Sequence, residues 1–271
     1  MNIVITGAGG VLCSAFSRAL AADGHKIALL DLNLEAAERE AEGIHKAGGE
    51  AIAVQANVLD KESLKKAHDV VLEKFGPCEV LINGAGGNNP KGTTTSEYFS
   101  KEDMLDENAR SFFDLDQDGV SFVFNLNFLG TLLTTQAFAT DMLETGGCIV
   151  NISSMNAITP LTKIPAYSGA KAAVSNFTQW LAVHFANCNI RVNAIAPGFF
   201  ATNQNRTLLF NEDGSLTPRS HKIISQTPMG RFGEPEELLG TLRFLIDNDA
   251  SGFVTGITIP VDGGFSAYSG V

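Results

Sequence analysis

Residues 2–22 read NIVITGAGGVLCSAFSRALAA, so that a short apolar run leads into a glycine-rich loop and then into an apolar-rich segment. The run at 3–6 predicts a strand, and residues 14–22 predict a helix that ends at Gly24. A glycine loop between a strand and a helix places backbone N–H groups and the helix N-terminus where a pyrophosphate can bind. The pattern favours a dinucleotide-binding fold, although a plain tight turn uses the same residue types.

Strand and helix patterns alternate along most of the chain. We expect strands at residues 3–6, 26–30, 51–55, 80–82, 149–153, 191–196 and 257–261, and helices at 14–22, 34–46, 61–75, 120–143, 167–186 and 235–246. This alternation predicts an α/β fold of one Rossmann-like domain over residues 1–271, a doubly wound parallel sheet flanked by helices. A chain of 271 residues, 44% of them hydrophobic, can bury the large core that such a domain needs.

Two segments interrupt the alternation. Residues 87–118 are polar without a clear period, and residues 199–227 are irregular, so we interpret them as an insertion over the substrate side and as a substrate loop. Within the insertion, DLDQDG at 114–119 matches the first half of a calcium loop, but its twelfth position is Asn125, where calcium requires a glutamate. We expect Asp116 and Asp118 to complement the N-terminus of the next helix instead, and we expect no metal site.

The composition limits the kinds of partner. A net charge of -11 and a pI near 4.9 argue against nucleic acid or an anionic membrane, because both repel an acidic surface. No apolar run is long enough to span a membrane. The four cysteines, Cys13, Cys78, Cys148 and Cys188, are scattered and include no CxxC pair, which suggests neither a zinc site nor a disulfide framework. A reducing cytoplasm is the expected location.

The glycine loop departs from a TGxxxGxG spacing. That spacing requires glycine at 7, 11 and 13, whereas this chain has Gly7, Val11 and Cys13, with additional glycines at 9 and 10. Asp31 strengthens the nucleotide interpretation, because it ends the second expected strand, 24 residues after Gly7, where an acid accepts hydrogen bonds from the adenosine ribose. The alternative is that Asp31 caps the next helix. The first interpretation predicts NAD rather than NADP.

The segment SMNAITPLTKIPAYSGAK at 154–171 carries the candidate chemistry. Tyr167 and Lys171 are four residues apart, so a helix places both on one face. Lowering a phenol pKa from ~10 to about 7 requires roughly 4 kcal/mol. A cation about 4 Å away supplies an energy of that order at an effective dielectric constant of about 20. The pair therefore suits proton transfer, with a hydrogen bond from Ser154 to the substrate oxygen. An ordinary packing pair is the alternative.

In their order along the chain, several motifs together resemble the short-chain dehydrogenase/reductase family. They are Thr6-Gly7-Ala8-Gly9-Gly10, Asn57-Val58, Asn83-Gly84-Ala85-Gly86, Asn127, Ser154, Tyr167, Lys171, Pro197-Gly198 and Asp262-Gly263-Gly264. The resemblance implies that Tyr167 is the acid/base, that Lys171 lowers its pKa and holds the nicotinamide ribose, and that Ser154, 13 residues before Tyr167, is the active serine rather than Ser153. It also implies that Asn127 anchors a water molecule and completes the catalytic set.

The same resemblance implies which residues contact the coenzyme NAD. The set is Gly7, Gly9, Gly10, Val11, Leu12, Asp31, Asn57, Val58, Asn83, Gly84, Ala85, Gly86, Tyr167, Lys171, Pro197, Gly198 and Thr202. A homotetramer is a further expectation, with the helices near 120–143 and 167–186 at one interface. Val11 and Cys13, which stand where the family spacing has glycine, lie in the segment expected to contact the coenzyme phosphates.

Within the family, the segments GGNNPKGTT, PGFFATNQNR and PVDGGFSAYSGV resemble the D-mannonate oxidoreductase group, which implies NAD-dependent hydride exchange with a six-carbon sugar acid. Ser154 would bind the substrate oxygen. The carboxylate of such a substrate needs a cation or amide cradle, for which Asn156, Lys163 and Arg206 are the candidates. Two alternatives stay open: a dehydrogenase of another polyol or keto acid such as gluconate, and a nucleotide sensor that keeps the fold without turnover.

Overall fold

The computed structural model describes residues 1–201 and 206–270, and these residues form a seven-stranded sheet in the order β3-β2-β1-β4-β5-β6-β7. Every neighbouring pair of strands is parallel. The strands are β1 (Asn2–Thr6), β2 (Lys26–Asp31), β3 (Glu50–Gln55), β4 (Val80–Asn83), β5 (Gly147–Ile152), β6 (Ile190–Pro197) and β7 (Thr258–Val261). The predicted doubly wound α/β fold is confirmed.

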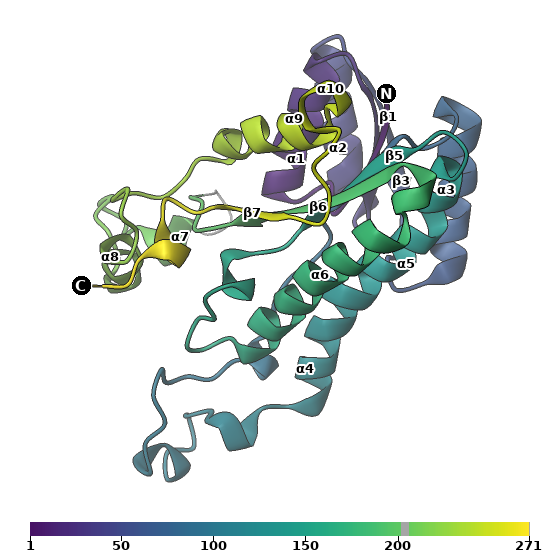
Figure 1. Cartoon of the computed structure of the whole chain (residues 1–271). Helices are drawn as coiled ribbons and strands as arrows, with labels where there is room; N and C mark the ends of the chain where they lie inside the picture. The colour runs from purple at the N-terminus through teal and green to yellow at the C-terminus, as the bar shows by residue number, and fades with distance from the viewer. Residues whose placement is uncertain (202–205, 271) are drawn as a thin grey trace.

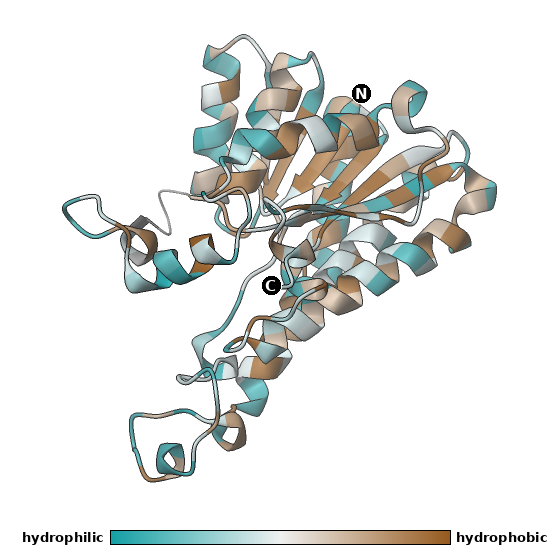
Figure 2. Cartoon of the chain, turned by 60° about the vertical axis from the view of Figure 1, so that its left-hand side comes forward, coloured by the Kyte–Doolittle hydropathy of each residue, from teal (hydrophilic) through white to brown (hydrophobic). Residues whose placement is uncertain are grey.

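Helices cover both faces of the sheet (Figure 1). One layer contains α1 (Val11–Ala22), α2 (Leu34–Lys46), α9 (Leu239–Ile246) and the short α10 (Asn248–Ser251). The other contains α3 (Lys61–Phe75), α4 (Gln117–Phe124), α5 (Gly130–Phe138) and α6 (Pro165–His184). Figure 2 shows the hydrophobic strands between these layers, with hydrophilic residues on the outer sides of the helices.

The alternation of side chains along each strand divides the core into two parts. In β1, Ile3 and Ile5 pack with the α1, α2 and α9 side, whereas Val4 packs with the α3, α5 and α6 side. All three residues are fully buried. Because successive side chains of a strand point to opposite faces, a strand that is apolar at every position must be covered on both.

The long helix predicted at 120–143 is divided into segments. A π-helical turn at Asn125–Leu129 separates α4 from α5, and a 3-10 turn at Ala139–Met142 follows α5. Asp116 is the N-cap of α4, where its carboxylate accepts the N–H of Gly119 at 2.7 Å, and Asp118 lies in the first turn. The predicted role of these two acids at the helix N-terminus is confirmed.

The insertion at 87–118 contains 3-10 turns at Pro90–Gly92, Glu102–Met104 and Phe112–Asp114. Its central part extends away from the sheet beside α4 (Figure 1). A backbone hydrogen bond from Thr94 N–H to the Lys163 carbonyl (2.9 Å) attaches it to the body, and one from Asp116 N–H to the Lys91 carbonyl (3.2 Å) joins the two ends of the insertion.

The segment at 199–227 is more regular than predicted. It contains α7 (Arg206–Leu209) and α8 (Pro218–Ser225). Thr217 caps α8 by accepting the N–H of Ser220, and Pro218 is its first residue, which is a standard helix start that the irregular pattern concealed. Apolar side chains from this segment, among them Leu209 and Ile223, form a small core with Phe232, which follows the segment.

Of the described helices, none is long and apolar enough to cross a membrane.

Candidate active site

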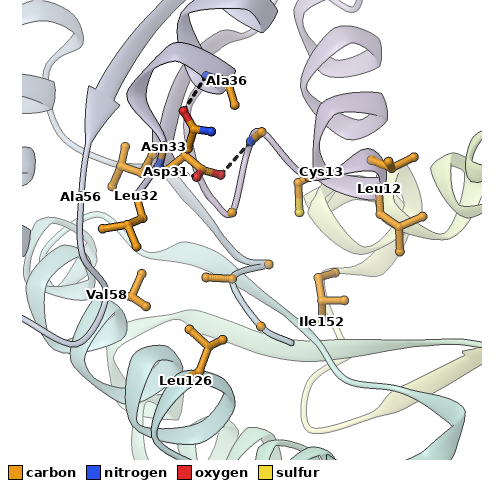
Figure 3. Close-up of a pocket in the computed structure, with 18 of the residues that line it drawn as sticks. Leu12, Cys13, Asp31, Leu32, Asn33, Ala36, Ala56, Val58, Leu126 and Ile152 are labelled. Atoms are coloured by element: carbon orange, nitrogen blue, oxygen red, sulfur yellow. Dashed lines mark hydrogen bonds between the residues drawn. The ribbon is translucent and has the colours of Figure 1, made fainter. Parts of the chain in front are cut away.

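A cavity of about 510 Å³ lies at the carboxyl ends of β1, β2 and β4. These strands are consecutive in space but not in sequence, so the cavity sits where the strand order reverses, the usual ligand position in open parallel sheets. Most of the predicted coenzyme residues line it: Gly7, Gly9, Gly10, Val11, Leu12, Asp31, Asn57, Val58, Gly84, Ala85, Gly86, Tyr167 and Lys171. Figure 3 shows Asp31 and Asn33 on one side of this cavity and Cys13 and Ile152 on the other.

The glycine loop leaves the N-terminus of α1 open toward the cavity. Gly7 has φ +65°, and a Cβ atom there would lie 2.9 Å from the backbone of Ala85, so the position requires glycine. Gly10 is the N-cap of α1 in extended conformation, and neither a side-chain cap nor an acidic residue occupies the first turn. The free N–H groups and the helix dipole at this end suit an anionic phosphate.

Cys13 replaces the third glycine of the family pattern, and the structure shows how it is accommodated. A Cβ atom on Gly84 would lie 2.1 Å from the Cys13 Sγ atom and 2.8 Å from the Thr6 carbonyl oxygen. The thiol therefore fills the space beside the Gly84 backbone. Burial raises the pKa of Cys13 to about 12, so the thiol is neutral and serves as a small apolar packing group.

Asp31 ends β2 with its carboxylate held by two backbone N–H groups. Gly9 donates to Oδ2 and Asn33 donates to Oδ1, each at 2.9 Å. Asn33, and not Asp31, caps α2 by accepting the N–H of Ala36 at 3.2 Å. The carboxylate is thus fixed at the rim of the cavity, and the capping alternative for Asp31 is wrong.

Tyr167 and Lys171 line the other end of the cavity, and Ser154 lies beside Tyr167. Tyr167 and Lys171 lie one turn apart in α6, with the Lys171 Nζ atom 5.7 Å from the centroid of the Tyr167 ring. The Tyr167 hydroxyl is hydrogen-bonded to Ser154. The Ser153 hydroxyl lies elsewhere, where it bonds the Lys171 carbonyl at 3.1 Å and the Ser175 hydroxyl at 2.7 Å, so the choice of Ser154 agrees with the geometry.

The predicted effect of Lys171 on Tyr167 is wrong for this arrangement. Burial raises the pKa of Tyr167 from 10.0, and the hydrogen bond with Ser154 only partly offsets this. Burial also lowers the pKa of Lys171 to about 8. The Lys171 ammonium donates to the Ile152 carbonyl at 2.7 Å. The sequence argument counted the attraction between the two groups but not the desolvation that accompanies their burial.

Asn127 connects the catalytic helix region to the loop after β4. It is fully buried in the π-helical turn, donates through Nδ2 to the carbonyls of Gly87 (2.7 Å) and Val123 (2.8 Å), and accepts the Gly87 N–H at 3.2 Å. A Cβ atom on Gly86 would lie 2.6 Å from Asn127 Oδ1 and 3.1 Å from Lys171 Nζ. Asn127, Lys171 and the loop backbone are therefore in close contact.

The other predicted coenzyme residues lie outside this cavity or outside the described residues. The Asn83 side chain points into the core, where Nδ2 donates to Asn151 (2.9 Å) and Thr135 (3.1 Å). Pro197 ends β6, and Gly198 donates its N–H to the Val261 carbonyl at 2.9 Å. Thr202 is not among the described residues.

The predicted substrate residues other than Ser154 have different environments. Asn156 is buried two residues after Ser154, in a 3-10 turn at Met155–Ala157. Lys163 is half-buried in the connection between this turn and α6, and Arg206 begins α7, although its side chain is not described. Lys163 lies near Glu97 of the insertion, which forms an ion pair with Lys222 of α8.

Sequence reasoning missed several apolar residues that line the cavity, among them Leu32, Leu126 and Ile152. Leu32 directly follows Asp31, and a leucine directly after the acid that ends a second strand was a usable sequence signal for an apolar wall; the structure shows that it is 66% exposed. Ile152 directly precedes Ser153 and Ser154. The position of its carbonyl, which accepts the Lys171 hydrogen bond, depends on the fold and has no sequence signal.

A protein-family model described as Enoyl-(Acyl carrier protein) reductase matches residues 8–266 of this chain. The chain belongs to the short-chain dehydrogenase/reductase family and is an oxidoreductase of that family.

Three similar proteins agree with this assignment. An "Uncharacterized oxidoreductase" of Haemophilus influenzae is 61% identical over 270 residues, which are 99% of this chain and 94% of that protein. The "Uncharacterized oxidoreductase UxuB" of Bacillus subtilis is 54% identical over 269 residues, 99% of this chain and 95% of that protein. A crystal structure from Haemophilus influenza, provisionally named a D-mannonate oxidoreductase and containing bound NAD, has a TM-score of 0.95 at 61% identity, covering 99% of this chain and 96% of that one.

Proposed function

We propose that this protein is an NAD-dependent oxidoreductase of sugar acids that reduces D-fructuronate to D-mannonate with NADH. The observation that carries the proposal is that Tyr167, with Ser154 beside it, and Lys171 line one end of a cavity whose other end is bounded by Asp31. The name given to the Haemophilus influenza structure, together with its bound NAD, supports the choice of substrate and coenzyme.

The cavity fits a dinucleotide on the chain's own features. The open N-terminus of α1 suits the pyrophosphate, and the Asp31 carboxylate suits the adenosine ribose hydroxyls and disfavours a 2′-phosphate. Leu32 and Val58 offer apolar surface on the same side as Asp31 (Figure 3). Lys171 reaches the cavity beside Gly86, where its ammonium would hold the nicotinamide ribose. When bound, the coenzyme supplies the hydride that the protein itself lacks.

The protonation state of Tyr167 suits reduction of a ketone. Because burial raises the pKa of its phenol, Tyr167 carries its proton at neutral pH and is ready to donate it to the oxygen of a substrate carbonyl. Ser154 shares a hydrogen bond with that phenol and positions the same substrate oxygen. Lys171 would act here by holding the nicotinamide ribose beside this phenol rather than by lowering the pKa of Tyr167.

The substrate carboxylate requires a local cation on a chain of net charge -11. We assign this role to Lys163, which lies between the Ser154 turn and α6, with Arg206 as a second candidate. The insertion at 87–118 and the segment at 199–227 would cover the substrate, because Glu97 and Lys222 join the two. Together these segments and the sheet make one catalytic domain.

We also propose a cytoplasmic homotetramer. The described cysteines are all free, which suits a reducing compartment. α4 and α6 expose Phe122 (45%), Trp180 (55%) and Val183 (80%), and exposed side chains of this kind suit subunit contacts. A mass of four chains in light scattering is the expected result.

The test of function combines substrate turnover with coenzyme binding. We expect the purified protein to oxidise NADH in the presence of D-fructuronate, and we expect Tyr167→Phe to lose at least 100-fold in kcat while the affinity for NADH, measured by fluorescence, is unchanged. NADH binding without turnover of any sugar acid would favour a nucleotide sensor. Faster turnover of 5-keto-D-gluconate or a neutral ketose would replace the substrate but keep the mechanism. Near-normal turnover of the phenylalanine variant would refute the role of Tyr167.

A further inference from the structure

The carboxamide oxygen of Asn156, two residues after the active serine, has no hydrogen-bond partner among the described residues. The residue is 7% exposed, and its Oδ1 atom is buried. The oxygen of Asn83 is also unpartnered, but the Asn83 side chain is anchored by two hydrogen bonds from its nitrogen. Buried polar groups in native proteins are rarely left unpaired, and one that is calls for an explanation such as strain, a bound water or ion, or a role in the site.

The turn that carries Asn156 is fixed relative to Ser154. The Asn156 N–H donates to Ser154 Oγ at 3.2 Å, and the Ala157 N–H donates to the Ser154 carbonyl at 2.9 Å. Met155 anchors the turn because it is 1% exposed and its carbonyl accepts the N–H groups of Ile158 and Thr159, each at 2.9 Å. The backbone of this turn is therefore fixed by hydrogen bonds, whereas the oxygen of the Asn156 carboxamide has no partner in the part of the chain that the structure describes.

We propose that the Asn156 carboxamide recognises a hydroxyl group on the carbon next to the reacting carbonyl, so that the site selects polyhydroxylated ketones. This inference rests on the proposed function, in which Ser154 and Tyr167 bind the carbonyl oxygen. Rotation of the terminal torsion, which is soft in asparagine, can present either the oxygen or the nitrogen of the amide. A hydroxyl satisfies both, because it donates and accepts.

The maximum reach of the side chain permits this assignment. The Asn156 backbone nitrogen lies 3.2 Å from Ser154 Oγ, and the end of the carboxamide extends at most about 4.5 Å from that nitrogen, so it reaches no farther than roughly 8 Å from the serine oxygen. On the substrate, a hydrogen bond of about 2.8 Å to the carbonyl oxygen, about 3 Å between oxygens on adjacent carbons and a second hydrogen bond sum to roughly the same length. A ketone with a methylene group at that carbon, as in an acyl chain, leaves the amide unpaired.

The experiment measures the coupling between Asn156 and the hydroxyl. Wild type and Asn156→Leu, which keeps the shape but removes both polar atoms, are assayed with D-fructuronate and with analogues that lack one or the other hydroxyl beside the carbonyl. We expect Asn156→Leu to lower kcat/KM about 10- to 100-fold for D-fructuronate. For one of the two deoxy analogues, the wild type and the variant should differ less than about 3-fold, because the lost hydroxyl has already removed the interaction.

Thr134→Val is the matched control. Its Oγ1 atom is also buried and unpartnered among the described residues, but Thr134 lies in α5 beyond the Asn127 turn. It should leave every kcat/KM within about 2-fold. The affinity for NADH should be unchanged in both variants. If Asn156→Leu does not fold, Asn156→Ser, which is smaller and keeps a hydroxyl, should lose part of the discrimination.

The outcomes separate this inference from the proposed substrate. An equal loss on D-fructuronate and on both deoxy analogues refutes the inference but leaves the enzyme a sugar-acid reductase. Turnover of a different hydroxyketone, with the same dependence on Asn156 and on the hydroxyl, supports the inference and refutes D-fructuronate. Turnover of simple acyl ketones at rates equal to those of hydroxyketones refutes both.

Discussion

Lys171→Met is expected to stabilise the protein at neutral pH while it abolishes turnover. Lys171 is 4% exposed, and burial lowers its pKa from 10.5 to about 8. At about 1.4 kcal/mol per pKa unit, this difference corresponds to about 3 kcal/mol of unfavourable free energy in the folded state. Methionine has a similar length without the charge, but it leaves the Ile152 carbonyl without its 2.7 Å hydrogen bond, a loss of about 1–2 kcal/mol. A net gain of about 1–2 kcal/mol follows.

The pH dependence of this difference is the sharper test. Below about pH 8 the lysine is charged in both the folded and the unfolded protein, so the folded protein carries the full free-energy cost of burying the charge. Between about pH 8 and 10.5 only the unfolded chain keeps the proton, so the stability of the wild type rises relative to the variant as the pH increases. The wild type should recover about 3 kcal/mol across this window and become the more stable of the two at its upper end.

Urea unfolding of the coenzyme-free proteins at pH 7, 9 and 10.5 measures this difference directly. Lys66→Met is the matched control, because Lys66 is exposed on α3 and a methionine there should change stability by the same small amount at every pH. If the unfolding free energies of the wild type and Lys171→Met differ by the same amount at every pH, burial does not set the pKa of this lysine and the prediction is refuted.

Two further substitutions test the coenzyme side of the cavity. Gly84→Ala should destabilise the protein by about 1–3 kcal/mol, because the new Cβ atom would lie 2.1 Å from Cys13 Sγ, and Cys13→Ala in the same chain should recover only part of this because the Thr6 carbonyl remains 2.8 Å away. Shifts in the urea midpoint measure both effects, and a lack of rescue would contradict the packing argument. Asp31→Ala should lower the preference in kcat/KM for NADH over NADPH by about 10-fold or more, since the carboxylate bound by Gly9 then no longer opposes a 2′-phosphate. An unchanged ratio would show that another group reads the ribose.

The fold was predictable because local signals and the global arrangement agree. The helices predicted at 34–46 and 61–75 coincide with α2 and α3, since Asn33 and Asp60 cap their N-termini and glycines follow their ends. The predicted strands differ from the observed ones by one or two residues. The π-helical turn at Asn125–Leu129 was not predictable, because the hydrogen bonds of Asn127 to Gly87 join positions 40 residues apart.

The candidate site was predictable as a set of residues but not in its electrostatics. The spacing of Tyr167 and Lys171 requires only helix geometry, and the structure places both on one side of α6. The direction of the Tyr167 pKa shift depends on how much water the packed environment removes, which no local pattern contains. The accommodation of Cys13 by Gly84 likewise depends on two segments that only the sheet brings together.

The π-helical turn limits changes in the length of the helical segment formed by α4, the turn itself and α5, here called the helical rod. Such a turn contains one residue more than an ordinary helical turn, and each residue of an α-helix advances by about 100°. Loss of a single position within Asn125–Leu129 would rotate everything after it, so that Leu133 and Phe138, which are now buried, would face another direction. Natural variation in chain length is therefore expected in the projecting insertion and not in this rod.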